Sequence, residues 1–207
     1  MAPRRTSLST IGATFIAVAV VISACHTEVG QPGVAVVYRP WLDSVCSLVR
    51  GASIEEAWKN ELVSRQEEFE AIWKDVSPDL LEGTQAITGE PLLSKRVTAN
   101  LTLCDFPSQS IAGISVNMRF SLRSFTPTPV PMRYKVDTLY HELLHDYIGH
   151  HPIRQSALLA QHARETACTR NHLHLLALQK AVLTRDHPEA LQAVIAIDSQ
   201  LPNGCYR

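Results

Sequence analysis

Residues 141–145 read His-Glu-Leu-Leu-His, and this run constrains the fold more than any other part of the chain. Four residues of an α-helix turn by about 400°, so His141 and His145 would emerge on one face, one turn apart. Two imidazoles placed in this way can bind a single metal ion, while the leucines between them seat the helix in a core. Glu142 is then positioned to take a proton from a water molecule at the metal. The run therefore predicts a core helix that carries a metal centre.

The chain around this helix has the size and composition of one globular domain. It has 207 residues, of which 45% are hydrophobic and 19% are charged, and this balance is typical of a folded protein. The formal net charge is -1 and no long basic run is present, so we expect no nucleic-acid partner. The metal-centre helix is expected to begin near Tyr134–Asp137, to run to Ile148 and to stop at Gly149.

The first 24 residues have the pattern of an export signal, with two arginines followed by an apolar stretch from Ile11 to Ile22. This stretch is shorter than the roughly 18 to 20 residues that a membrane-spanning helix needs. The following Ser23-Ala24-Cys25 completes a tetrad that resembles a bacterial lipobox. That resemblance implies a signal peptide over 1–24, lipidation of Cys25, a tether over 25–33 and a place in the cell envelope. A secretory signal cleaved nearby, with Cys25 incidental, is the alternative.

Apart from Cys25, the chain has four cysteines, an even number that indicates two disulfides in an oxidising compartment. We expect helices over 155–183 and 187–200 to form an antiparallel hairpin, which would place Cys168 and Cys205 at similar distances from the turn. These two cysteines are predicted to pair, and Cys46–Cys104 follows by elimination. Because the sequence contains no Cys-x-x-Cys pair, a zinc site made of cysteines is disfavoured.

The remaining periodicity predicts a mixed fold. Ser53 to Glu56 reads as a capping box for a helix over 54–76, and Ser77-Pro78 is expected to end that helix. The segments expected to form strands, from their β-prone or alternating residues, are 34–38, 96–104 and 114–122.

The segment from Tyr140 to Asp146 resembles the active-site helix of the zincin metallopeptidases. That family needs a third protein ligand for zinc, and two subfamily patterns compete for it. The gluzincin pattern points to Glu165, twenty residues after His145, and the metzincin pattern points to His151. Ile148 occupies the position where metzincins have glycine, so Glu165 is preferred. His151 is the rival ligand, and His150 and His162 complete the alternatives.

The zincin resemblance implies an α+β, zincin-like single domain over 34–207. A small antiparallel sheet would pack on the active-site helix, and a C-terminal helical hairpin would supply Glu165. Zinc-polarised water would attack a peptide carbonyl with Glu142 as general base. In that family a strand before the helix pairs with extended substrate, which would make Asn117 or Arg119 a contact unless both simply face solvent. The candidates for stabilising the oxyanion are Tyr140, Tyr147, His172 and His174.

The expected partners are a peptide or protein substrate and, through the lipid anchor, a membrane. The chain is expected to be a monomer. A second hypothesis is a surface lipoprotein that binds zinc without catalysis, as a metal-binding or interaction module.

Overall fold

The structure, a computed structural model, describes residues 33–111 and 113–200. The predicted signal peptide, Cys25 and nearly all of the predicted tether lie outside these residues. None of the described helices is long and apolar enough to cross a membrane. The elements of the described chain, in order, are β1 (Gly33–Tyr38), α1 (Pro40–Arg50), α2 (Glu56–Thr88), β2 (Arg96–Thr102), β3 (Ile114–Asn117), a 3₁₀ turn η1 (Arg119–Ser121), α3 (Met132–His150), α4 (Ala157–Gln161), α5 (Ala167–Asp186) and α6 (Pro188–Asp198).

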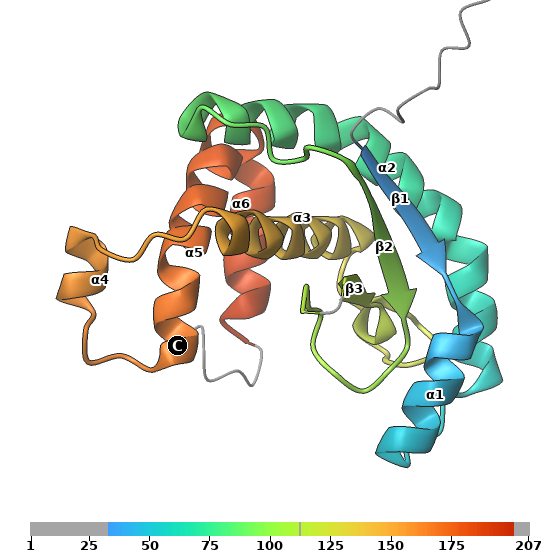
Figure 1. The fold of residues 1–207 in the computed structure, drawn as a ribbon. Coiled ribbons are helices and arrows are strands. Elements are labelled where there is room, and N and C mark those ends of the chain that lie inside the picture. The colour runs from blue at the N-terminus through green and yellow to red at the C-terminus, as the bar shows by residue number, and fades with distance from the viewer. Residues whose placement is uncertain (1–32, 112, 201–207) are drawn as a thin grey trace, which may run out of the picture.

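The three described strands form a parallel sheet in the order β1-β2-β3, as Figure 1 shows for β1 and β2. The prediction of an antiparallel sheet is therefore wrong. Side-chain alternation indicates which residues face the core but is the same for either strand direction. The direction is set by the connections: α1 and α2 return the chain between β1 and β2, as parallel neighbours require. Because β2 and β3 are also parallel, the connection between them returns the chain to the end of the sheet at which β2 begins.

Helix α2 continues well past the predicted stop at Ser77-Pro78 and contains Pro78. Proline inside a helix removes one backbone hydrogen bond and costs about 3 kcal/mol. The apolar stripe continues on both sides of the proline, however, and Val76 and Leu80 are both buried in the core. Packing therefore outweighs the local penalty. The helix ends at Gly89, whose positive φ of 79° permits its N–H to bond the Gln85 carbonyl.

Other element ends also differ from the sequence prediction. Helix α2 begins at Glu56 with Glu55 as N-cap and no side-chain cap, so Ser53 does not form the expected capping box. Strand β3 ends at Asn117, because the chain turns into η1 where the alternation predicted more strand. Helix α3 runs to His150, beyond Gly149. The helix expected over 155–183 is divided into the short α4 and the long α5.

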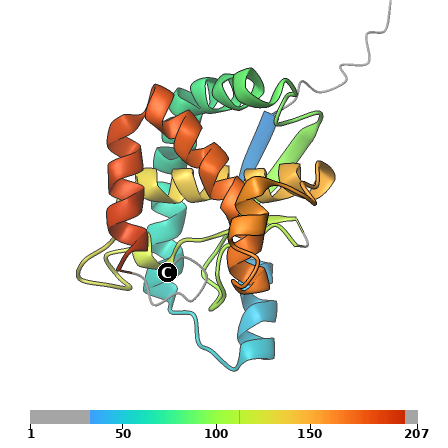
Figure 2. The same cartoon turned by 90° about the vertical axis from the view of Figure 1, so that its left-hand side faces the viewer.

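Helix α3 lies across the middle of the molecule, with elements packed on several sides (Figures 1 and 2). It contacts β3, α2 and the hairpin of α5 and α6. The hairpin itself was predicted from the sequence, and α5 and α6 pack against each other. The residues that α3 buries are Met132, Lys135, Val136, Asp137, Leu139, Tyr140, His141, Glu142, Leu143, Leu144 and Tyr147.

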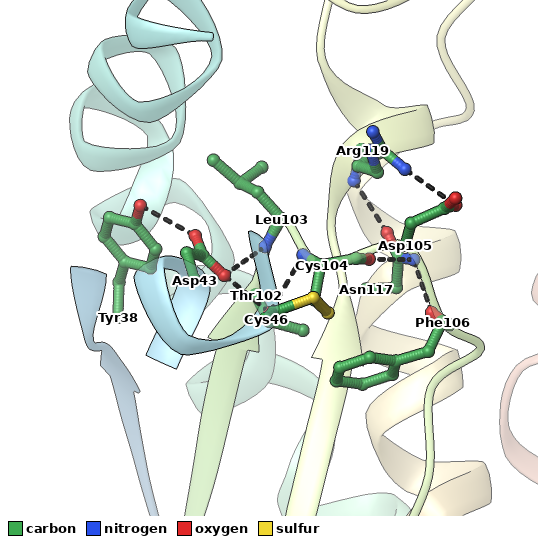
Figure 3. The surroundings of a disulfide bond; sticks show 10 residues. All are labelled: Tyr38, Asp43, Cys46, Thr102, Leu103, Cys104, Asp105, Phe106, Asn117 and Arg119. Carbon is green, nitrogen blue, oxygen red and sulfur yellow. Dashed lines mark hydrogen bonds and ion pairs between the residues drawn. A yellow bond between two sulfur atoms is a disulfide. The ribbon is translucent and has the colours of Figure 1, made fainter. Parts of the chain in front are cut away.

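A disulfide between Cys46 and Cys104 joins α1 to the segment after β2, which confirms that predicted pair (Figure 3). Beside it the buried carboxylate of Asp43 accepts hydrogen bonds from Thr102 Oγ1 at 2.7 Å and from the backbone N–H of Leu103 at 3.0 Å. Cys168 is also disulfide-bonded, and its predicted partner Cys205 lies outside the described residues. The end of β2 is thus fixed to α1 by both a covalent and a polar link.

Gly83 allows α2 to approach α5 closely. A Cβ at this position would lie 2.9 Å from Val182 Cγ1 and 2.6 Å from Asp186 Oδ2. We expect Gly83→Ala to lower the free energy of unfolding by about 1–3 kcal/mol, because the buried valine cannot move aside. Gly149→Ala is the control, because a Cβ at this position in α3 would meet nothing within 4 Å. Denaturant unfolding checks both variants, and a stabilised Gly83→Ala would contradict this packing.

Candidate metal centre

Three histidines from two helices come together beside the buried face of α3. His141 and His145 lie one turn apart on α3, and His172 lies on α5. One ligand nitrogen from each ring falls within 4.8 Å of the other two, so the group is placed to bind a metal ion. The Nε2 atoms of His145 and His172 are 3.1 Å apart. Two metal–nitrogen bonds of about 2.1 Å at a tetrahedral angle separate their nitrogens by about 3.4 Å, so the spacing fits one ion.

Carbonyl oxygens orient two of the three imidazoles. Nδ1 of His141 lies 3.0 Å from Oε1 of Gln179, a buried residue of α5. Nδ1 of His172 lies 2.8 Å from the backbone carbonyl of Cys168, one turn earlier. Because an oxygen of this kind only accepts, each ring must carry its proton on Nδ1, and Nε2 keeps the lone pair that a metal ion needs. The donor set therefore fits a metal ion.

Burial favours the neutral, metal-binding form of His141 and His145. It lowers the pKa of His141 to about 4, although the hydrogen bond with Gln179 acts in the opposite direction. Burial and the neighbouring His172 lower the pKa of His145 to about 4. Protons therefore compete with a metal ion for these two rings less than they would at exposed histidines.

The third member of the group is His172, and the third ligands considered from the sequence, Glu165, His151, His150 and His162, are not part of it. Glu165 is exposed in the turn between α4 and α5, outside the three-histidine group. His151 follows α3, and its Nδ1 lies 3.0 Å from the Tyr147 carbonyl. The gluzincin expectation placed Glu165 inside a continuous helix. The break at 162–166 removes that helix, and α5 begins only at Ala167.

Helical periodicity held a signal for His172 that sequence analysis did not use. Cys168, His172, Leu175, Gln179 and Val182 follow one another at steps of four and three residues, which places them on one face of α5. Leu175, Gln179 and Val182 on that face are buried. A histidine on the core-facing stripe, one turn before the first buried leucine, was therefore a better ligand candidate than an acidic residue outside the stripe.

Glu142 lies next to a cavity that also reaches the metal group. Glu142 and His141 both line a cavity of about 190 Å³ between α3, α6 and the segments around β3. The Glu142 side chain is 5% exposed, and burial raises the pKa of its carboxyl to about 8. A cation at the histidines would lower that pKa by charge attraction. A proton-accepting group and the metal group thus adjoin one space that a small substrate segment can enter.

Strand β3 does not offer the free edge that the zincin resemblance implied. Gln109 and Ser115 exchange backbone hydrogen bonds of 2.9 and 2.8 Å, so the loop after β2 occupies that edge. Asn117 donates from its amide to the carbonyls of Cys104 and Phe106, as Figure 3 shows. Arg119 forms an ion pair of 2.7 Å with Asp105. Both proposed substrate contacts are therefore buried and bonded within the chain, although Asn117 lines the cavity.

The structure also places the remaining residues that were considered for stabilising the oxyanion. The Tyr140 hydroxyl is buried 2.7 Å from Thr84 Oγ1, which leaves it no access to a substrate. His174 and His145 line a second cavity, of about 470 Å³. Tyr147 lines neither of these cavities.

No family model, curated protein or solved structure matches the chain.

We expect His172→Ala to abolish tight metal binding, because it removes one of three ligand nitrogens. Glu165→Ala should bind metal as the wild type does, and so should the control His174→Ala, which changes a histidine two residues along the same helix. Calorimetric titration with Zn²⁺ and the zinc content of purified protein check this. Loss of binding in Glu165→Ala with retention in His172→Ala would show that the centre is built as the gluzincin pattern implied.

Gln179 is expected to position His141. Gln179→Leu removes the acceptor of the Nδ1 proton, and such a loss typically weakens metal binding by about 10–100-fold. Gln179→Glu keeps an acceptor at the same place and should retain the affinity. Zinc titration of both variants checks the role. Equal weakening in the two variants would show that Gln179 acts through packing and not through its oxygen.

Proposed function

We propose that this chain is an exported zinc-dependent peptidase, with His141, His145 and His172 as zinc ligands and Glu142 as general base. The observation that carries the proposal is the placement of Glu142 beside the three-histidine group, at a cavity that His141 also lines. Three protein ligands leave a fourth tetrahedral position for water or substrate, which is the arrangement of catalytic zinc sites.

The donor set supports zinc as the metal. Neutral imidazoles suit zinc well, and the hard cations calcium and magnesium prefer oxygen ligands. Zinc held there would lower the pKa of a water molecule and polarise the carbonyl of the substrate. The export signal and the disulfide of Cys46 and Cys104 are consistent with an oxidising compartment.

Glu142 would perform the proton transfers. Its carboxylate would accept a proton from the attacking water and donate it to the amine that leaves when the peptide bond breaks. The low exposure of Glu142 keeps bulk water from exchanging that proton between the two steps. Gln179 would hold the His141 ring so that Nε2 faces the metal throughout.

The cavity favours a short or unfolded segment as substrate. Its volume of about 190 Å³ admits only a few residues of an extended chain and excludes a folded domain. The alternative function, a zinc-binding lipoprotein or interaction module without catalysis, would use the same ligands but would not need the carboxylate of Glu142.

Glu142→Gln separates these two functions. We expect this variant to bind zinc as the wild type does but to lose peptide hydrolysis by about 10²–10⁴-fold, because the amide cannot accept the proton. Glu67→Gln, the same change on an exposed face of α2, is the matched control and should keep full activity. Cleavage of a quenched fluorogenic peptide library, with zinc content measured on the same samples, checks the prediction.

Absence of chelator-sensitive cleavage in the zinc-loaded wild type would contradict the peptidase and favour the binding module. Full activity in Glu142→Gln would remove Glu142 from the mechanism even if the metal is required.

A further inference from the structure

Lys135 is a buried cation in the wall of the same cavity. It lies in the first turn of α3, is 6% exposed and lines the cavity together with Glu142 and His141. None of the ion pairs within the described residues includes Lys135. Lysines are almost never this buried unless they are paired. A buried ammonium group at this position therefore needs an anion within ion-pair distance, and the described chain provides none.

The acidic groups near Lys135 are bound by other side chains. Asp198 attracts the ammonium group from beyond ion-pair distance, and its Oδ1 accepts a hydrogen bond of 2.6 Å from the Tyr134 hydroxyl. Asp137 pairs with Arg133 at 3.1 Å. The Tyr134 ring lies 5.5 Å from the Lys135 nitrogen and adds a weak attraction.

The position of Lys135 costs stability. Burial lowers the pKa of its ammonium group to about 8, which still leaves it mostly charged at pH 7. The positive end of the α3 dipole also disfavours a cation in the first turn. Methionine, with a side chain of similar length, could fill the same space without either penalty. A buried cation at such a place is better explained by a ligand than by the fold.

We propose that Lys135 binds a carboxylate of the peptide substrate at the end of the cavity away from the metal group. This inference rests on the proposed peptidase function for the identity of the ligand. Peptides carry one kind of anion, the carboxylate, at the C-terminus and on Asp and Glu side chains. Because β3 offers no free edge for strand pairing, a charged contact of this kind would be the principal means of fixing the register of the substrate.

The geometry of α3 sets the place of that carboxylate. Lys135 and Glu142 are seven residues apart on the helix, which is about two turns and about 10 Å along the axis. An extended peptide advances about 3.3–3.6 Å per residue. The carboxylate would therefore lie about three residues from the bond that is cleaved. A free C-terminus at this place would mean that the enzyme releases short C-terminal peptides.

Binding of small peptides tests the inference without hydrolysis. The probes are acetyl-Ala-Ala-Ala with a free C-terminus, its C-terminal amide, and acetyl-Ala-Glu-Ala amide, which carries its carboxylate on a side chain. Calorimetry is done on the full chain, both zinc-loaded and after chelation, because a metal ion can itself bind carboxylates. We expect the free acid to bind at least about tenfold more tightly than the amide in both states. The glutamyl peptide shows whether a side-chain carboxylate serves equally.

Three variants complete the experiment. Lys135→Met should lose the preference for the carboxylate, and the control Lys180→Met, which changes an exposed lysine of α5, should keep it. Lys135→Met should also unfold at the same or a higher denaturant concentration, because it removes a buried charge. Asp198→Asn, which keeps an acceptor for Tyr134, should strengthen binding of the free acid severalfold by removing a competing negative charge.

Equal binding of the acid and the amide to the wild type would overturn the inference. So would a retained preference in Lys135→Met, a less stable Lys135→Met, or unchanged or weaker acid binding by Asp198→Asn. Failure of the peptidase would look different: a carboxylate preference that depends on Lys135, without any peptide cleavage, leaves the binding site in place and contradicts only the proposed hydrolysis. Cleavage with equal binding contradicts only the carboxylate site.

Discussion

The burial of α3 is the constraint on which the rest of the site depends. Helix α3 contacts β3, α2, α5 and α6, and most of its residues are buried, polar ones among them. Each buried polar group on it must find a partner inside the protein or pay a desolvation cost of about 1–3 kcal/mol or more. His141 meets this demand with Gln179, and Tyr140 meets it with Thr84. Glu142 and Lys135 face the cavity instead.

The same burial gives the site its chemistry. It favours the neutral imidazole at His141 and His145, and neutral imidazole is the form that binds metal. It raises the pKa of Glu142, which makes that carboxylate a stronger proton acceptor once it is ionised. Charges in a space of this kind are also screened less than charges at the surface. A small cavity with buried charged groups in its wall can therefore discriminate between substrates.

Local patterns predicted the parts of this structure that depend on neighbouring residues. The spacing of His141 and His145 predicted the helix and the shared face of two ligands. Cysteine pairing was correct for Cys46 and Cys104, although the argument rested on elimination. The direction of the strands and the continuation of α2 past Pro78 depend on contacts between distant segments, which alternation and breaker residues do not describe.

The third ligand illustrates the same limit. Glu165 was chosen by its distance along the chain from His145, which presupposed one helix over 155–183. The break between α4 and α5 changed which residues of that segment face α3. His172 faces the centre because it lies on the same stripe of α5 as Leu175 and Gln179, which pack in the core. Helical periodicity indicates the stripe, but the packing of α5 against α3 brings it to His141 and His145.

The loop after β2 links the fold to the proposed mode of recognition. Cys46 holds Cys104 at the start of this loop, and Asn117 bonds the carbonyls of Cys104 and Phe106. These bonds keep the loop along β3, where Gln109 occupies the edge that a substrate backbone would otherwise use. A peptidase that cannot pair with the backbone of its substrate must position it by side chains. The buried charge of Lys135, two helical turns from Glu142, is the group best placed in the described cavity to do so.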